Sequence, residues 1–214
     1  MIPELGHIIL NAYLVLCLVG GILPLAAIFF NNAALEMPIK RVTTLLFSLI
    51  TFSFLILIYS FLVDDFSVAY VAQNSNINLP FYFKFAATWG AHEGSLILWI
   101  LAMNAWLIGF IFLTKCKNIY FLNTVFSISC QVMFAFTLFT LLTSNPFERI
   151  LPIPPLNGAD LNPSLQDIAF TIHPPLLYFG YSGLLIPFAI AVACLLYTSP
   201  SPRDLSTSRM PSSA

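Results

Sequence analysis

Residues 94–113 read GSLILWILAMNAWLIGFIFL, an unbroken stretch without Lys, Arg, Asp or Glu. A helix rises about 1.5 Å per residue, so about 20 apolar residues cross the hydrocarbon core of a bilayer. A charged side chain at the bilayer centre costs about 2.5–3.5 kcal/mol, which explains why such a stretch excludes charge. The stretch therefore predicts a transmembrane helix.

Comparable apolar runs lie on both sides of this stretch, at residues 8–30, 43–63, 120–143 and 175–197. The chain is 59% hydrophobic and only 8% charged, whereas soluble domains carry about 25% charged residues. We therefore predict an all-α fold, a polytopic integral membrane helical bundle with about five spans in the lipid bilayer. The net charge of −1 gives no basic footprint for nucleic acid.

The basic residues predict the orientation of the bundle. The first and third connections contain Lys40, Arg41, Lys115 and Lys117. By the positive-inside rule these connections are cytoplasmic. The N-terminus and the segments 64–93 and 144–174 are then expected outside, which in a Gram-negative cell means the periplasm. Because no basic n-region precedes the first run, that run is expected to stay as a span rather than be cleaved.

The last residues differ in composition from the rest of the chain. Of residues 198–214, six are serine and three are proline, and such a segment cannot bury a core. We predict a membrane part at 1–197, followed by a disordered, foreign tail at 198–214. A natural short cytoplasmic tail is the alternative.

The three histidines, His7, His92 and His173, all fall on the predicted outer side. His173 precedes Pro174 and Pro175. A residue before proline avoids helical geometry, and proline favours the first helical position. This pattern predicts His173 just outside the fifth span, at the membrane rim. An imidazole held there could be an axial ligand to haem iron, with Tyr178 packed on the haem; the alternative is that His173 only caps the helix and reaches water.

A second group of candidate residues is WGAHEGS, residues 89–95. His92 and Glu93 stand at the outer end of a predicted helix, where the helix dipole favours an acidic residue. One interpretation is a haem-binding or partner-binding corner that includes Trp89, or a proton-handling pair. The other is helix initiation beside an aromatic belt at the interface.

Two basic residues of the outer segments are candidates for pairing with a haem propionate. Arg149 or Lys84 could make charge-assisted hydrogen bonds to such a carboxylate. The alternative for each is that it neutralises Glu148 or lies among lipid headgroups. His7 is assigned no role.

Several motifs together resemble the start of the cytochrome c maturation protein F family, the CcmF/NrfE-type haem lyases. They occur in family order as Ile2-Pro3-Glu4-Leu5-Gly6, Tyr70-Val71-Ala72, the block 89–96, Asn145-Pro146-Phe147, Leu161-Asn162-Pro163 and His173-Pro174-Pro175-Leu176-Leu177-Tyr178. The resemblance covers residues 1 to about 197.

The resemblance implies a multi-span protein of the cell inner membrane that works in cytochrome c-type biogenesis. Such a protein would receive haem from a periplasmic haem chaperone and take part in joining it to apocytochrome c, beside other cytochrome c maturation membrane proteins. The resemblance also implies that His173 is the axial ligand for the incoming haem. It gives no settled role to His92.

The chain departs from the family in length and in its histidines. Family members are about three times as long; they have a second external histidine and two intramembrane histidines that hold a resident haem b, the cofactor that the resemblance implies. None of these is among the three histidines present. We therefore expect a truncated chain that is inactive as a lyase on its own. The alternatives are a membrane transporter or channel subunit and a scaffold that only docks partners.

Overall fold

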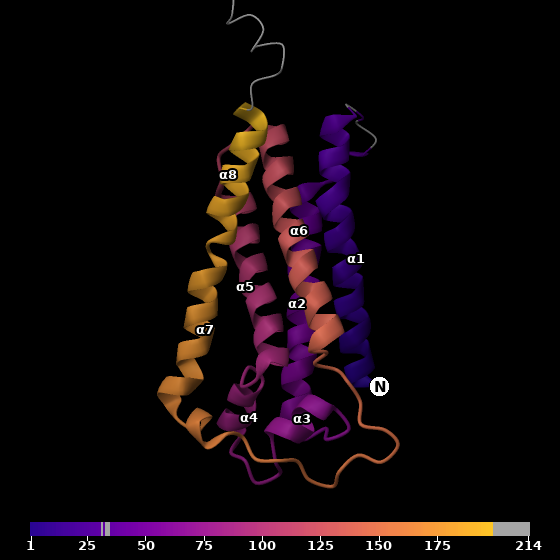
Figure 1. Ribbon diagram of the computed structural model, residues 1–214, viewed down its shortest axis with the longest axis vertical. Helices are drawn as coiled ribbons and strands as arrows, with labels where there is room; N and C mark the ends of the chain where they lie inside the picture. The colour runs from indigo at the N-terminus through magenta and orange to yellow at the C-terminus, as the bar shows by residue number, and fades with distance from the viewer. Residues whose placement is uncertain (31, 33–34, 199–214) are drawn as a thin grey trace, which may run out of the picture.

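The computed structural model describes residues 1–30, 32 and 35–198, and these form helices joined by turns. The long helices are α1 (Ile2–Phe29), α2 (Ile39–Leu62), α5 (His92–Leu113), α6 (Ile119–Thr143), α7 (Ile168–Ser182) and α8 (Leu185–Thr198). They run side by side, with α7 and α8 following each other along one flank (Figure 1). The described residues contain five candidate membrane spans, because α7 and α8 together supply the fifth. The predicted all-α, five-span membrane bundle is confirmed.

The spans pack in a chain of neighbours. Helix α1 lies against α2 and α6, α2 lies against α5, and α6 lies against α8. Their shared core contains fully buried side chains such as Leu10, Leu46, Ile50, Ile97 and Leu107. Between 33 and 50% of each of the first four spans is buried, but only 22% of the fifth. The remaining apolar surface has no partner within the described chain, as expected for helices that face lipid.

A proline inside α1 shows how these helices are joined. Pro24 has no N–H, so the carbonyl of Gly20, four residues earlier, lacks its helical donor. The Ser127 hydroxyl of α6 donates to that carbonyl at 3.2 Å. A Cβ on Gly20 would lie 3.1 Å from the Cys130 sulfur, so the glycine permits the close approach. A backbone carbonyl inside lipid needs such a partner from a neighbouring helix.

The short helices lie at the end of the bundle that carries the N-terminus. They are α3 (Ala69–Asn74), α4 (Phe81–Ala87) and the 3₁₀ turn η2 (Pro163–Leu165). The connection from α6 to α7 runs across this end (Figure 1). Backbone hydrogen bonds from Ala69 to Glu148, from Ile150 to Ser67 and from Ala159 to Ala72 fasten it to the segment around α3. The two long predicted outer segments therefore form one layer.

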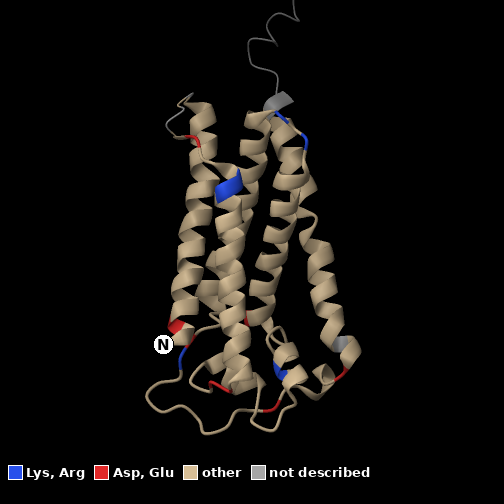
Figure 2. Cartoon of the chain, turned by 180° about the vertical axis from the view of Figure 1, so that it is seen from behind, with Lys and Arg blue, Asp and Glu red and all other residues tan. Residues whose placement is uncertain are grey.

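Charge divides the two ends of the bundle (Figure 2). The end with the N-terminus, here called the acidic end, contains Glu4, Asp64, Asp65, Glu93, Glu148, Asp160 and Asp167, with Lys84 and Arg149. The opposite, basic end contains Lys40, Arg41, Lys115 and Lys117, with Glu36. This division is the basis of the predicted orientation, which stays a prediction.

The helix bounds differ from the predicted runs mainly where prolines stand. Helix α1 begins at Ile2 rather than residue 8, because Pro3 fits the first turn of a helix. The fifth span begins well before residue 175 and is broken between α7 and α8, where Gly183 donates to the Gly180 carbonyl, one residue short of the α-helical register. Residues 199–214 lie outside the described residues, so the predicted tail stays a prediction.

Candidate functional site

His173 lies inside α7, which begins at Ile168. The prediction that it stands outside the helix, with Pro174 as the first helical residue, is wrong. Asp167 starts the helix instead: its carboxylate accepts the Ala169 N–H at 2.7 Å, and its carbonyl accepts the Thr171 N–H at 2.9 Å. This side-chain cap outweighs the local preference of a residue before proline for extended geometry.

Two prolines in the middle of α7 leave backbone carbonyls without helical donors. Pro175 cannot donate to Thr171, the residue four positions earlier. The indole N–H of Trp89 fills this role and donates to the Thr171 carbonyl at 3.1 Å. Trp89, one of the predicted site residues, is therefore a structural partner of the helix that carries His173.

A second tryptophan joins the other end of α7 to α5. Trp106 donates its indole N–H to the Phe179 carbonyl at 2.8 Å. That carbonyl lacks its usual α-helical donor because the Gly183 N–H donates to Gly180 instead, and the Ser182 hydroxyl also donates to it at 3.0 Å. The ring of Trp106 also packs against the Phe179 ring, with centroids 4.8 Å apart. Since α7 is a peripheral helix, its contacts with Trp106 of α5 and with Trp89, just before α5, hold it in position.

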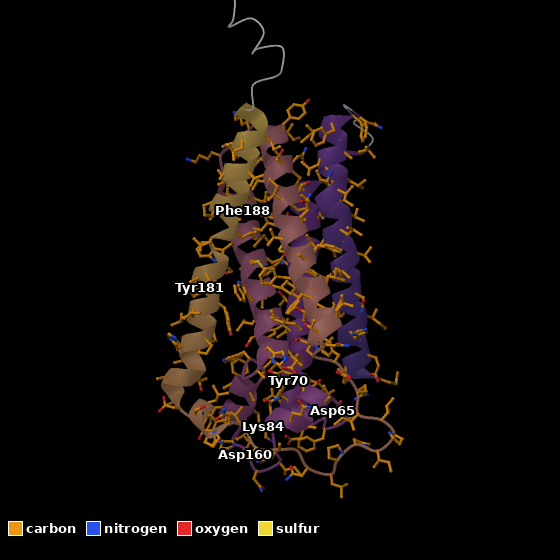
Figure 3. The ribbon with its side chains drawn as sticks, viewed as in Figure 1. Asp65, Tyr70, Lys84, Asp160, Tyr181 and Phe188 are labelled. Atoms are coloured by element: carbon orange, nitrogen blue, oxygen red, sulfur yellow. The ribbon has the colours of Figure 1, made fainter. Side chains whose placement is uncertain are left out.

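The surface around His173 is apolar and open. His173 is exposed, and one turn along α7 lie Leu176 and Leu177, 66 and 37% exposed. A Cβ built on Gly180, one further turn away, would meet nothing within 4 Å. Tyr181 lies on the same outer flank of the bundle (Figure 3) and is also exposed. The described face offers an exposed imidazole next to an apolar strip.

The other face of α7 borders a cavity of about 500 Å³ at the acidic end. Trp89, His92, Pro174 and Tyr178 contribute to its walls. Tyr178 stacks on Trp99 of α5, with ring centroids 5.6 Å apart. The structure thus brings three predicted site residues, Trp89, His92 and Tyr178, to one cavity. His173 is not among its lining residues, so Tyr178 does not share the surface of His173.

The block 89–95 forms a tight turn that begins α5. The hydroxyl of Tyr70 lies 3.0 Å from the carbonyl oxygens of both Ala87 and Thr88 and accepts the Ala91 N–H at 3.3 Å. Burial raises the pKa of Tyr70 well above its ordinary value, so the hydroxyl keeps its proton. A Cβ on Gly94 would lie only 1.6 Å from the Thr88 carbonyl oxygen, so this position requires glycine.

Within this turn, His92 and Glu93 form a loose pair. The His92 Nδ1 lies 3.7 Å from a Glu93 carboxylate oxygen, and the two side chains are 71 and 18% exposed. That buried oxygen, Oε2, has no hydrogen-bond partner. The arrangement leaves the imidazole free to reach solvent while the carboxylate points into the protein.

Arg149 and Lys84, the predicted propionate partners, are both already engaged. Arg149 pairs with Glu4 at 2.8 Å and with Asp65 at 3.5 Å, and it donates to the Ser67 hydroxyl. Lys84 pairs with Asp64 at 2.5 Å. Figure 3 shows Asp65 and Lys84 in the layer at the acidic end. A propionate would have to displace one of these carboxylates, and neither basic residue neutralises Glu148 as the alternative predicted.

The described residues contain no group of three or more His, Cys, Asp or Glu side chains that could hold a metal ion. A single exposed imidazole matches one axial ligand to haem, because the porphyrin itself supplies four nitrogen ligands to the iron. Sequence reasoning missed Tyr70 and Trp106. Neither has a local signal, because each hydrogen bond joins elements far apart in the sequence.

Comparison with known proteins gives a consistent result. A sequence model of the family described as "Cytochrome C assembly protein" matches residues 89–210, more than half of the chain. The match begins at Trp89 and includes α5 to α8. It also runs past residue 197, the predicted end of the membrane part.

Curated relatives align with nearly the whole chain. The "Cytochrome c-type biogenesis protein CcmF" of Pseudomonas aeruginosa is 44% identical over 196 residues, which cover 92% of this chain and 30% of the relative. The protein of the same description in Escherichia coli is 43% identical with the same coverage. "Cytochrome c-type biogenesis protein NrfE" of Haemophilus influenzae is 40% identical and covers 92% of this chain and 31% of its own length.

A solved structure titled "Cytochrome c Heme Lyase CcmF" has the same fold. It superposes with a TM-score of 0.78 at 25% identity, over 92% of this chain and 31% of that chain. The chain thus spans about 30% of the length of the relatives that it matches. The resemblance seen in the ordered motifs is confirmed: this multi-pass membrane chain belongs to the cytochrome c assembly protein family.

Proposed function

We propose that the chain is the N-terminal membrane part of a haem-handling protein of cytochrome c-type biogenesis. The matched family and the names of the relatives support this proposal. Since the chain corresponds to about 30% of those relatives, the complete lyase activity is a property to be tested in a full-length setting. On its own the chain would hold haem without attaching it.

The proposal assigns His173 as an axial ligand to haem iron. The observation that carries it is an exposed imidazole on α7, followed by an apolar strip that ends at the open position Gly180. A flat apolar ring system could lie along this strip without meeting a side chain at Gly180. The residues present therefore fit haem on the outer face of α7.

Trp89 and Tyr178 have a different role in this proposal from the one that the sequence predicts. Trp89 completes the hydrogen bonding of α7 at Thr171, and Tyr178 stacks on Trp99 of α5. Both hold the helix from its inner side and so fix the height and rotation of His173. They are positioning residues, and His92 remains a predicted partner-binding or proton-handling residue.

The cofactor proposed at His173 is the incoming haem, a haem b held without a covalent bond to the chain and distinct from the resident haem of the family. When bound, haem supplies the vinyl groups to which the thiols of an apocytochrome are joined. The chain's own residues would bind the iron and orient the ring, and the orientation of two reactants is itself a large contribution to rate.

The proposed location is the cell inner membrane, with the acidic end in the periplasm. The excess of basic residues at the other end supports this orientation through the positive-inside rule. His173 then lies where a periplasmic haem chaperone and apocytochrome c could reach it. Other membrane proteins of cytochrome c maturation would be its neighbours in the bilayer.

A chimeric protein tests this function. Residues 1–197 would replace the matching first part of the Pseudomonas aeruginosa relative in a strain that lacks its own copy. Covalently haem-stained cytochrome c is expected with the chimera and with a His7→Ala chimera, and is expected to be lost with His173→Ala. Equal staining with His173→Ala would contradict the ligand role, and no staining with the unaltered chimera, despite its presence in the membrane, would contradict the function.

A further inference from the structure

The basic end carries cations that lack acidic partners. Figure 2 shows basic residues on the first turn of α2 and in the connection from α5 to α6. Lys40, Arg41, Lys115 and Lys117 form no ion pair within the part of the chain that the structure describes. Lys84 and Arg149 at the acidic end are both paired. The basic end therefore has positive charge available for an anion.

Two adjoining hollows open at this end and share Lys40 and Arg41 on their rims. One has a volume of about 530 Å³ and is walled by apolar residues that include Ile111, Ile119 and Leu122. The other has a volume of about 410 Å³ and includes Leu45 and Phe112 in its wall. They lie at the end of α5 and the starts of α2 and α6. Each hollow thus combines two cations with a wall of membrane-spanning helices.

The local geometry places the cations at the boundary between apolar and polar surroundings. The Lys40 ammonium lies 5.7 Å from the centroid of the Phe112 ring, within the range of a cation–π contact. The first turn of α2 also has no side-chain cap, whereas the Asn118 side chain caps α6 by accepting the Phe121 N–H at 3.2 Å. The uncapped N–H groups of α2 add donors beside the same two cations.

The two adjoining hollows together form one groove between α2, α5 and α6. We propose that this groove binds an anionic phospholipid. Its phosphate would lie against Lys40 and Arg41, and its acyl chains would follow the apolar walls toward the bilayer interior. Basic pockets between membrane helices bind anionic headgroups by this combination of charge and apolar surface. A free phosphate matches only the rim of the groove, and a neutral lipid matches only its walls. The site is independent of haem binding at the opposite end.

Lipid retention by the purified full chain tests the proposal. The chain in detergent would be titrated with phosphatidylglycerol, with phosphatidylcholine and with inorganic phosphate, and bound lipid would be counted by native mass spectrometry. The test variant is Lys40→Gln/Arg41→Gln. The matched control is Lys115→Gln/Lys117→Gln, which removes the same charge from the same end but alters no residue that lines either hollow.

We expect phosphatidylglycerol to bind in preference to phosphatidylcholine. The affinity for phosphatidylglycerol should fall about thirtyfold in the Lys40/Arg41 variant, because two cations that attract the headgroup are removed. In the Lys115/Lys117 variant, the loss of binding free energy is expected to be less than about a third of the loss in the Lys40/Arg41 variant. Equal loss in both variants would overturn the site in favour of diffuse surface attraction. Equal retention of phosphatidylcholine, or competition by phosphate alone, would overturn it as well.

If the Lys40/Arg41 variant does not fold, Ile119→Trp decides the question. Ile119 is an exposed residue in the wall of the larger hollow, so a larger side chain there would occupy the groove and leave all four cations in place. Loss of phosphatidylglycerol binding is the expected result. Unchanged binding would overturn the groove as the site.

Discussion

The Trp89 indole N–H donates to the Thr171 carbonyl oxygen at 3.1 Å, across 82 positions of sequence. Pro175 leaves that carbonyl without its helical donor. The contact therefore replaces a missing backbone hydrogen bond with one from a neighbouring element. It also ties the helix that carries His173 to the turn that begins α5.

Replacing Trp89 by Phe should destabilise the bundle by about 1–3 kcal/mol, because a backbone carbonyl loses its donor while the ring is largely kept. Unfolding of the purified chain in mixed micelles measures this change. Adding Pro175→Ala to Trp89→Phe should recover part of the loss, since residue 175 then has its own N–H for Thr171.

Trp106→Phe is the matched control for this prediction. Phe179 would keep a donor, because the Ser182 hydroxyl also donates to its carbonyl at 3.0 Å. The loss should therefore be smaller than for Trp89→Phe. Equal losses for both tryptophans, together with no recovery from Pro175→Ala, would refute the proposed role of the Trp89 indole.

Gly94→Ala should disrupt the turn that carries His92. The added methyl would lie 1.6 Å from the Thr88 carbonyl oxygen, so backbone must move. Gly109→Ala, on the same helix, should be neutral or slightly stabilising because its added methyl meets nothing within 4 Å and alanine favours helix. Thermal unfolding of both variants gives the comparison, and a harmless Gly94→Ala would show that the turn is not constrained as described.

Lys84→Gln should cost more stability than Arg149→Gln. The Lys84 side chain is 9% exposed, and its removal leaves the Asp64 carboxylate, 22% exposed, without a counter-charge; the loss is expected at about 3 kcal/mol, the lower limit for a buried pair, because Asp64 keeps some contact with solvent. Arg149 pairs with Glu4 and Asp65, whose side chains are 50 and 29% exposed. Solvent screens these pairs more than it screens the pair of Lys84 and Asp64, so the loss should stay below about 1 kcal/mol. The reverse order in a denaturation series would contradict this assignment.

Ser127→Ala should weaken the contact between α1 and α6 by about 1 kcal/mol, since the Gly20 carbonyl loses the hydroxyl donor that takes the place of the N–H missing at Pro24. Ser129→Ala is the control, because Ser129 donates to Val125 within its own helix. The difference between the two variants isolates the interhelical bond. No difference would mean that the Ser127 contact contributes nothing to packing.

The spans could be predicted because membrane crossing is a local property. Any run like 94–113, apolar and long enough, must form its own backbone hydrogen bonds in lipid. The order of motifs such as 89–95 and His173-Pro174-Pro175 also identified the family correctly. The length of the apolar runs, their composition and the order of the motifs can all be read directly from the sequence.

The helical position of His173 could not be predicted in this way. The rule for residues before proline describes isolated local preference, whereas Asp167 and Trp89 supply caps and donors that the rule does not include. Arg149 is a similar case. Its partner Glu4 lies 145 positions away, so only the folded bundle shows that its charge is already used.

A haem titration of the purified full chain tests the central claim that His173 on α7 binds haem iron. Wild type and His92→Ala are expected to bind haem with similar affinity and with the absorption spectrum of an imidazole-ligated iron. His173→Ala should bind about tenfold more weakly or worse, a loss of at least about 1.4 kcal/mol, and free imidazole should restore the spectrum. If His173→Ala binds haem with the affinity and spectrum of the wild type, the claim is contradicted.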